Sequence, residues 1–198
     1  MLNRIVVVFQ RLRFMNPYPI SKVVVFILPL LVTATANSLD RLSASAIEPG
    51  FFLFLEKFHG HTCAGSLMGA RMGLAAKSAL KAAGGAGKLK ARYFDQTCLV
   101  DGIQVAAGTT FGNHAIEILD RNECRLLLSA ETNARQVEAR LTRNAEEKGK
   151  MFRDLRSKAR ELPAGSPMRQ RLERSAEDVL YWFRTAPDAD VVQVRVVK

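Results

Sequence analysis

One short segment holds three side chains of the kinds that bind transition metals. His59, His61 and Cys63 are each two residues apart, in a chain with only three His and three Cys. In an extended segment all three side chains point to one side, and in a tight loop they can converge. Imidazole and thiolate together suit zinc and other borderline-soft divalent ions. The segment therefore predicts a metal site or a reactive thiol. The alternative is a helix-capping His beside a small core Cys.

A second group of chemically active side chains follows about 35 residues later. On a helix, Cys98, Asp101 and Gln104 are spaced i, i+3 and i+6 and share one face. We expect Cys98 and Asp101 to be metal ligands, with Gln104 supporting them from behind. Asp101 could equally be a general base or the acceptor that orients an imidazole. The alternative is a solvent-facing stripe, so the group gains meaning only if it faces residues 59–63.

The loop after this group is a third candidate. Gly108 and Gly112 flank an aromatic residue, which indicates a tight loop that approaches another part of the molecule closely. We expect Thr109 and His114 to support the metal site without binding the ion directly. An ordinary surface histidine is the alternative for His114. We predict no role for Cys124.

Two helices and a break between them should position the first group. An apolar run predicts a short buried helix over residues 51–58, and a segment rich in Leu, Met, Ala and Lys predicts a second helix over residues 66–83. Gly65, Gly69 and Gly73 recur every four residues and therefore share a helix face. Another backbone can approach such a face closely.

The rest of the chain predicts a mixture of strands and helices. Thr97 is expected to cap the helix that carries Cys98. Because strands and helices do not alternate strictly, we predict an α+β fold in which a small, mainly antiparallel sheet packs with helices. The expected elements are a strand at 88–95, a helix at 97–107, a hairpin of 115–119 with 125–129, helices at 132–161 and 168–183, and a closing strand at 191–197.

The amino-terminal residues are typical of a targeting signal. An apolar run at 23–32 follows Lys22 and precedes the small residues Ala34 and Ala36. This order is that of a secretory signal peptide, and the run is shorter than the ~20 residues of a membrane span. We expect a signal peptide cleaved near Ala36, or an uncleaved membrane anchor. Both place the folded part in an extracytoplasmic space, the periplasm. A reversible disulfide is possible chemistry there.

Composition and charge limit the remaining choices. With 48% apolar and 24% charged residues, the chain is that of a folded globular protein. The net charge is +10, and residues 133–174 contain 12 Lys and Arg against 6 Asp and Glu, a surplus of six. We interpret this surplus as a solvated helix face and expect no nucleic-acid partner. The predicted division is 1–36 signal peptide or anchor, 37–48 linker, 49–132 metal-binding core domain, and 133–198 helical extension with a closing strand.

Three motifs together resemble one known family. Phe58–Gly65, Cys98–Gln104 and Gly108–Gly112 are similar to the motifs of the formylmethanofuran dehydrogenase E-subunit family. The resemblance covers roughly residues 51–130. It implies an α+β domain that tends to dimerise and that binds a metal, often zinc, near the motif residues. Some members add a cysteine-rich zinc finger after the core, but no cysteine follows Cys124 here.

The chain departs from the family pattern at four positions. Ala64 stands where the family usually has Pro, Thr109 where it often has Cys, and Asn113-His114 where it has Lys-Gly. We expect an exported metal-binding protein of an accessory, carrier or sensor-like kind. The partners expected are the metal ion and a second copy of the chain. The alternatives are a metal-dependent enzyme, hydrolytic or redox, and a thiol–disulfide protein that uses Cys63 and Cys98.

Overall fold

The described part of the protein is an α+β fold, as the sequence predicts. The computed structural model describes residues 47–198, so the predicted signal segment lies outside the described residues. The helices described are α2 (Pro49–His59), α3 (Ala64–Ala82), α4 (Leu99–Ala107), α5 (Arg143–Arg160), α6 (Pro167–Thr185) and α7 (Asp188–Val191). The strands described are β1 (Leu89–Tyr93), β2 (Ile116–Ile118), β3 (Arg125–Ala130), β4 (Gln136–Leu141) and β5 (Val192–Val196).

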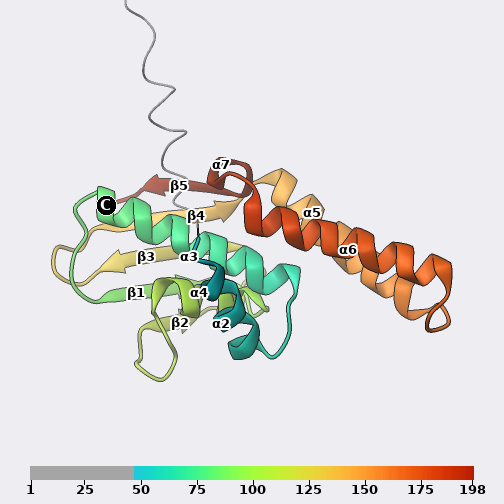
Figure 1. Ribbon diagram of the computed structural model, residues 1–198. Helices are drawn as coiled ribbons and strands as arrows, with labels where there is room; N and C mark the ends of the chain where they lie inside the picture. The colour runs from blue at the N-terminus through green and yellow to red at the C-terminus, as the bar shows by residue number, and fades with distance from the viewer. Residues whose placement is uncertain (1–46) are drawn as a thin grey trace, which may run out of the picture.

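These strands form one sheet with helices on one face. The strand order is β2-β1-β3-β4-β5 (Figure 1). Only β1 and β2 pair in parallel, and the other three pairings are antiparallel, which confirms the mainly antiparallel sheet. Side chains alternate between the faces of a strand. In β3, Leu126, Leu128 and Ala130 are buried, whereas the intervening residues are only partly covered. The hydrophobic core therefore lies between the sheet and the helices.

The helices α3 and α4 touch backbone to backbone. A Cβ atom on Gly69 would collide with the carbonyl group of Leu99, and one on Gly102 would collide with the carbonyl oxygen of Ser66. At Gly73 a Cβ atom would lie 2.7 Å from the Cβ atom of Ala106. The predicted use of the glycine face for close packing is confirmed. This contact brings the amino-terminal ends of the two helices together.

The predicted hairpin of residues 115–119 with 125–129 is wrong. β2 and β3 do not pair with each other, because β1 lies between them. The backbone N–H groups of Arg121 and Glu123 both donate to the carbonyl oxygen of Phe94, which follows β1. The segment between β2 and β3 therefore crosses the end of β1. The turn signal, with Asn122 at a φ of 52°, marks this crossing.

The predicted helix at 132–161 is wrong in its first third, where the chain forms β4. Val137, Ala139 and Leu141 are buried in the core. Glu138 faces the other side and accepts hydrogen bonds from Arg140 and Arg195. The alternation of apolar and charged residues fits a strand, but it is short and runs directly into the charged sequence of the following helix. α5 begins afterwards, and its N-cap, Thr142, accepts a hydrogen bond from the backbone of the helix.

Two smaller expectations also need correction. The helix α2 forms, but it is not a buried helix: Leu55 is 1% exposed, whereas Leu53 is 62% and Phe54 58% exposed. A single apolar stripe suffices to pack α2 against α4, so the other apolar side chains remain outside. The cap of α4 is Cys98 and not Thr97, so that helix begins at Leu99.

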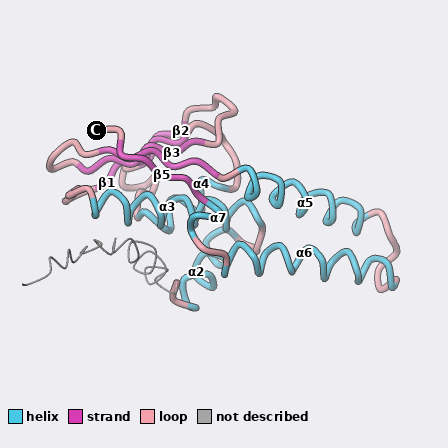
Figure 2. The backbone as a smooth tube through the Cα atoms, turned by 90° about the horizontal axis from the view of Figure 1, so that it is seen from above, coloured by secondary structure: helices cyan, strands magenta, loops and turns pink. Residues whose placement is uncertain are grey.

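The C-terminal part completes the sheet and adds a helical hairpin. α5 and α6 lie side by side and extend beyond the sheet (Figures 1 and 2). After α6 the chain returns to place β5 beside β4, so residues after 132 supply two of the five strands. Arg71 of α3, only 2% exposed, ties this return to the core by donating to the carbonyl oxygens of Phe183 and Ala186. Among residues 47–198, none of the helices combines the length and apolar character needed to cross a membrane.

Candidate metal centre

Three helix ends meet at the two sequence motifs. His59 is the last residue of α2, which stops because Gly60 adopts a left-handed conformation with a φ of 86°. Cys63 is the N-cap of α3, and Cys98 is the N-cap of α4. One ligand atom from each of His59, Cys63 and Cys98 lies within 4.8 Å of the other two. We call these three residues the His–Cys–Cys cluster.

The sulfur of Cys63 is held in a defined position. It lies 3.4 Å from Nε2 of His59 and accepts a hydrogen bond from the backbone N–H of Ser66, at 3.3 Å. The hydroxyl group of Ser66 donates in turn to the carbonyl oxygen of Cys63, at 3.0 Å. The cap of α3 therefore fixes the position of a sulfur that could bind a metal. The positive end of the α3 dipole favours negative charge at that position.

The imidazole of His59 is oriented from behind. Its Nδ1 atom lies 2.6 Å from Oδ2 of Asp101, and the His59 side chain is 8% exposed. Gln104 donates to the other carboxylate oxygen of Asp101, at 3.3 Å, and accepts a hydrogen bond from the backbone N–H of Phe111, at 2.7 Å. An Nδ1–H that donates to a carboxylate leaves Nε2 available for a metal. Asp101 thus occupies the orienting position, one of the three roles considered from sequence. Its carboxylate, predicted as a metal ligand, is outside the group of converging ligand atoms.

The electrostatics of Cys98 differ from those of an isolated thiol. Burial, and then the neighbouring Cys63, raise the pKa of the Cys98 thiol above its ordinary value. Two nearby sulfurs resist double ionisation because two negative charges would repel each other. A cation between such sulfurs removes that repulsion and favours thiolates. The arrangement is therefore suited to a positively charged ion.

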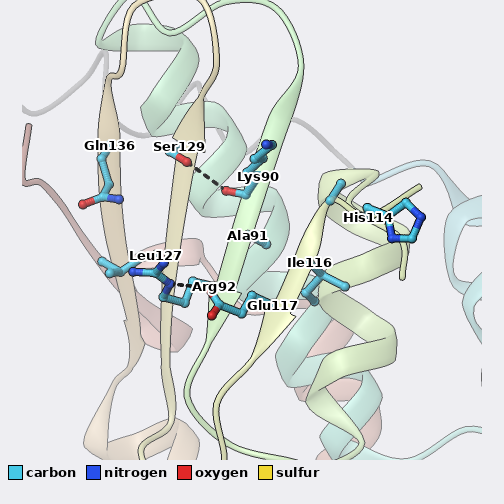
Figure 3. Close-up of a pocket in the computed structure, with 10 residues that line it drawn as sticks. Lys90, Ala91, Arg92, His114, Ile116, Glu117, Leu127, Ser129 and Gln136 are labelled. Atoms are coloured by element: carbon cyan, nitrogen blue, oxygen red, sulfur yellow. Dashed lines mark hydrogen bonds and ion pairs between the residues drawn. The ribbon is translucent and has the colours of Figure 1, made fainter. Parts of the chain in front are cut away.

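The remaining predicted site residues lie at varying distances from the cluster. His61 is exposed, and its ring centroid is 4.6 Å from that of His59, but it is outside the group of converging ligand atoms. Thr109 is fully buried, and its Oγ1 atom has no hydrogen-bond partner among the described residues. His114 lines a separate pocket on the outer face of the sheet (Figure 3). The structure does not bring His114 to the cluster.

A large pocket adjoins the cluster. Its volume is about 1050 Å³, and Cys63, Cys98 and His61 line it together with residues of α5. Cys124 lines the same pocket, so all three cysteines face one space. Burial raises the pKa of the Cys124 thiol, and Tyr93 is its hydrogen-bond partner, at 3.6 Å. No sequence pattern pointed to Cys124 or α5 here, because neither is near the motifs along the chain.

Fold and site together define an α+β domain with a His–Cys–Cys site at a helix junction. The family model described as "FmdE, Molybdenum formylmethanofuran dehydrogenase operon" matches residues 58–193. This match spans more than half of the chain and includes all three motifs. The protein belongs to the FmdE family, which confirms the resemblance of its motifs.

A solved structure supports the fold. It is the crystal structure of a tungsten formylmethanofuran dehydrogenase FmdE-like protein from Syntrophus aciditrophicus. The two chains are 21% identical, with a TM-score of 0.50, and the match covers 75% of this chain and 71% of the other. Among curated proteins, none matches this sequence significantly.

Proposed function

We propose that the protein binds a divalent transition metal, zinc foremost, through His59, Cys63 and Cys98. The observation that carries this proposal is the convergence of the three ligand atoms within 4.8 Å of one another. One imidazole and two sulfurs bind borderline-soft ions such as zinc better than they bind Mg²⁺ or Ca²⁺, which require oxygen ligands. The carboxylate of Asp101 behind His59 is the usual support of a metal-binding histidine.

The protein acts, in this proposal, as an exported accessory, carrier or sensor-like protein. A cluster at the ends of three helices is held by backbone packing, which suits stable retention of an ion. Export is supported by the apolar run at 23–32 and the small residues that follow it. Export is tested by fractionating cells that produce the full chain and sequencing the amino terminus of the mature protein. Mature protein that begins near residue 37 in the periplasm is expected, and unprocessed protein in the cytoplasm would contradict export.

An enzyme is the second candidate, and one observation favours it. Three protein ligands beside an open space are the pattern of catalytic zinc sites, whereas structural sites have four protein ligands. Here the cluster has three members and borders a pocket of about 1050 Å³. A metal in such a site supplies Lewis-acid chemistry to a molecule in the pocket. Asp101 would keep His59 oriented during any such reaction.

Elemental analysis tests the metal proposal. The protein is purified without chelators or immobilised-metal columns, and metal per chain is measured for the wild type, Cys63→Ser and Cys124→Ser. We expect one metal per chain in the wild type and in Cys124→Ser, and almost none in Cys63→Ser. Of these two cysteines, only Cys63 belongs to the cluster. A metal-free wild type with a Cys63–Cys98 crosslink in mass spectrometry would refute the proposal and support thiol–disulfide chemistry.

A further inference from the structure

A row of arginines forms one wall of the pocket beside the cluster. Arg153, Arg156 and Arg160 of α5 line the same pocket as Cys63 and Cys98. Their spacing of three and four residues places them on one face of the helix. These residues are about 90 positions away from Cys63 in the sequence, so only the fold brings them to the cluster.

The packing of α5 fixes this wall. Gly149 lets the helix approach α3, since a Cβ atom there would lie 2.9 Å from Cε of Met68. Ala145 and Phe152 of α5 are buried in the core. The arginines follow Phe152 on the part of the helix that borders the pocket. Their backbone positions are therefore determined by core contacts and not by contacts between surface charges.

The three guanidinium groups are available for a ligand. Within residues 47–198 none of them lies within 4.0 Å of a carboxylate oxygen, whereas Arg143 on the same helix is paired with Glu147. Among the described residues, Arg160 donates only to the carbonyl oxygen of Arg156, at 3.3 Å. The acidic residues that line the pocket are Asp95 and Glu146. The pocket wall thus carries three positive charges against two negative ones.

The pocket also has an apolar part and a suitable size. Met68, Leu99, Leu141 and Phe152 line it together with the arginines and the cluster cysteines. Pockets for small organic ligands have volumes of roughly 300–1,000 Å³ and combine apolar walls with a few polar groups. This pocket, at about 1050 Å³, is of that kind. A bare ion would need neither the volume nor the apolar wall.

We propose that this pocket binds a small organic anion, with its carboxylate or phosphate group on Arg153, Arg156 and Arg160 and its other end against the His–Cys–Cys cluster. Guanidinium groups bind carboxylate and phosphate oxygens through paired hydrogen bonds. The inference rests on the proposed metal site and names the class of molecule that would meet it. From the sequence, the basic residues of this region are expected to form a solvated helix face, whereas this proposal gives three of them a ligand.

Cobalt-loaded protein tests this proposal by absorption spectroscopy without any assay of activity. Under anaerobic conditions the protein is loaded with Co²⁺ and titrated with 3-mercaptopropionate or with its neutral analogue 3-mercaptopropanol. We expect both thiols to change the cobalt spectrum, and the carboxylate to bind about tenfold more tightly, as one good charged contact of ~1.4 kcal/mol would give. The variant Arg153→Gln/Arg156→Gln should lose this preference while it keeps its cobalt stoichiometry.

A matched variant controls for overall charge. Lys150→Gln/Lys158→Gln removes two positive charges from the same helix at exposed positions that do not line the pocket. It should keep the tenfold preference. Equal affinities of the wild type for the two thiols, or an equal loss of preference in both double variants, would overturn the inference while leaving the metal site intact. Failure of the wild type to take up cobalt would refute the metal proposal itself, and with it a ligand at the cluster.

Discussion

Two regions of this protein combine a histidine with charged side chains, but they are built differently. On the outer face of the sheet, a pocket of about 310 Å³ includes His114, Arg92 and Glu117 (Figure 3). Arg92 and Glu117 form an ion pair at 2.6 Å, and their side chains are 53% and 54% exposed. At the helix junction, His59 is 8% exposed and is held by Asp101. We call the first region the sheet-face pocket; the second is the His–Cys–Cys cluster.

The difference lies in what fixes the side chains. In the sheet-face pocket, flexible side chains meet in water, where an ion pair contributes little and tolerates change. At the cluster, Cys63 and Cys98 are helix N-caps, and the close contact of Gly69 and Gly102 sets the distance between those caps. If the geometry of a site depends on contact between two backbones, adding a single methyl group at that contact should disturb the site. Four substitutions test this contrast, from the largest expected effect to the smallest.

Loss of one sulfur of the cluster should weaken metal binding more than any other change. Cys98→Ser is expected to lower metal affinity by more than about 100-fold, because a hydroxyl group is a poor substitute for a thiolate on a soft ion. His114→Ala, in the sheet-face pocket, should keep full metal content. Elemental analysis after dialysis measures both. Equal metal content in the two variants would remove the distinction between the two regions.

Loss of the helix contact should unfold or distort the molecule. Gly102→Ala places a methyl group against the carbonyl oxygen of Ser66 and should lower the free energy of unfolding by about 2–4 kcal/mol. Gly112→Ala is the control, because nothing lies within 4 Å of a Cβ atom there. Urea denaturation followed by circular dichroism gives both values. A Gly102→Ala protein as stable as Gly112→Ala would show that the contact does not position the caps.

Loss of the support behind His59 should weaken metal binding without abolishing it. Asp101→Asn keeps the shape of the side chain but removes the charge that orients the imidazole. We expect a metal affinity about 10–100-fold lower, with the stoichiometry retained at high metal concentration. Competition with a chromophoric chelator measures this change. Unchanged affinity would mean that the 2.6 Å contact has no role in ligation.

Loss of the exposed ion pair should have the smallest effect. Arg92→Ala removes the partner of Glu117, and we expect a stability change of no more than about 1 kcal/mol. Metal content should not change, since the pair lies across the sheet from the cluster. Thermal unfolding and elemental analysis on the same sample measure both quantities. A larger loss of stability would show that the sheet face is also a rigidly built region.

The sequence predicted the residues of the candidate site better than it predicted the pairing of the strands around it. The three cluster residues lie in two short motifs, so the sequence could single them out, but it also named His61 and Asp101, which are outside the converging atoms. The glycine spacing of α3 indicated that a second backbone would pass close by. β4 was missed because its short alternation of apolar and charged residues runs directly into the charged sequence of α5. The placement of β1 between β2 and β3 is a long-range pairing that no local turn signal encodes. The arginine wall was missed for the same reason, because the tertiary position of α5 creates it.

The central claim is that His59, Cys63 and Cys98 bind one metal ion, and X-ray absorption at the metal edge tests it most directly. For protein purified with its zinc, we predict two sulfur neighbours at about 2.3 Å and at least one nitrogen neighbour at about 2.0 Å. The sulfur count should fall to one in Cys98→Ser protein reloaded with excess zinc. A wild-type spectrum with only nitrogen and oxygen neighbours would contradict the claim.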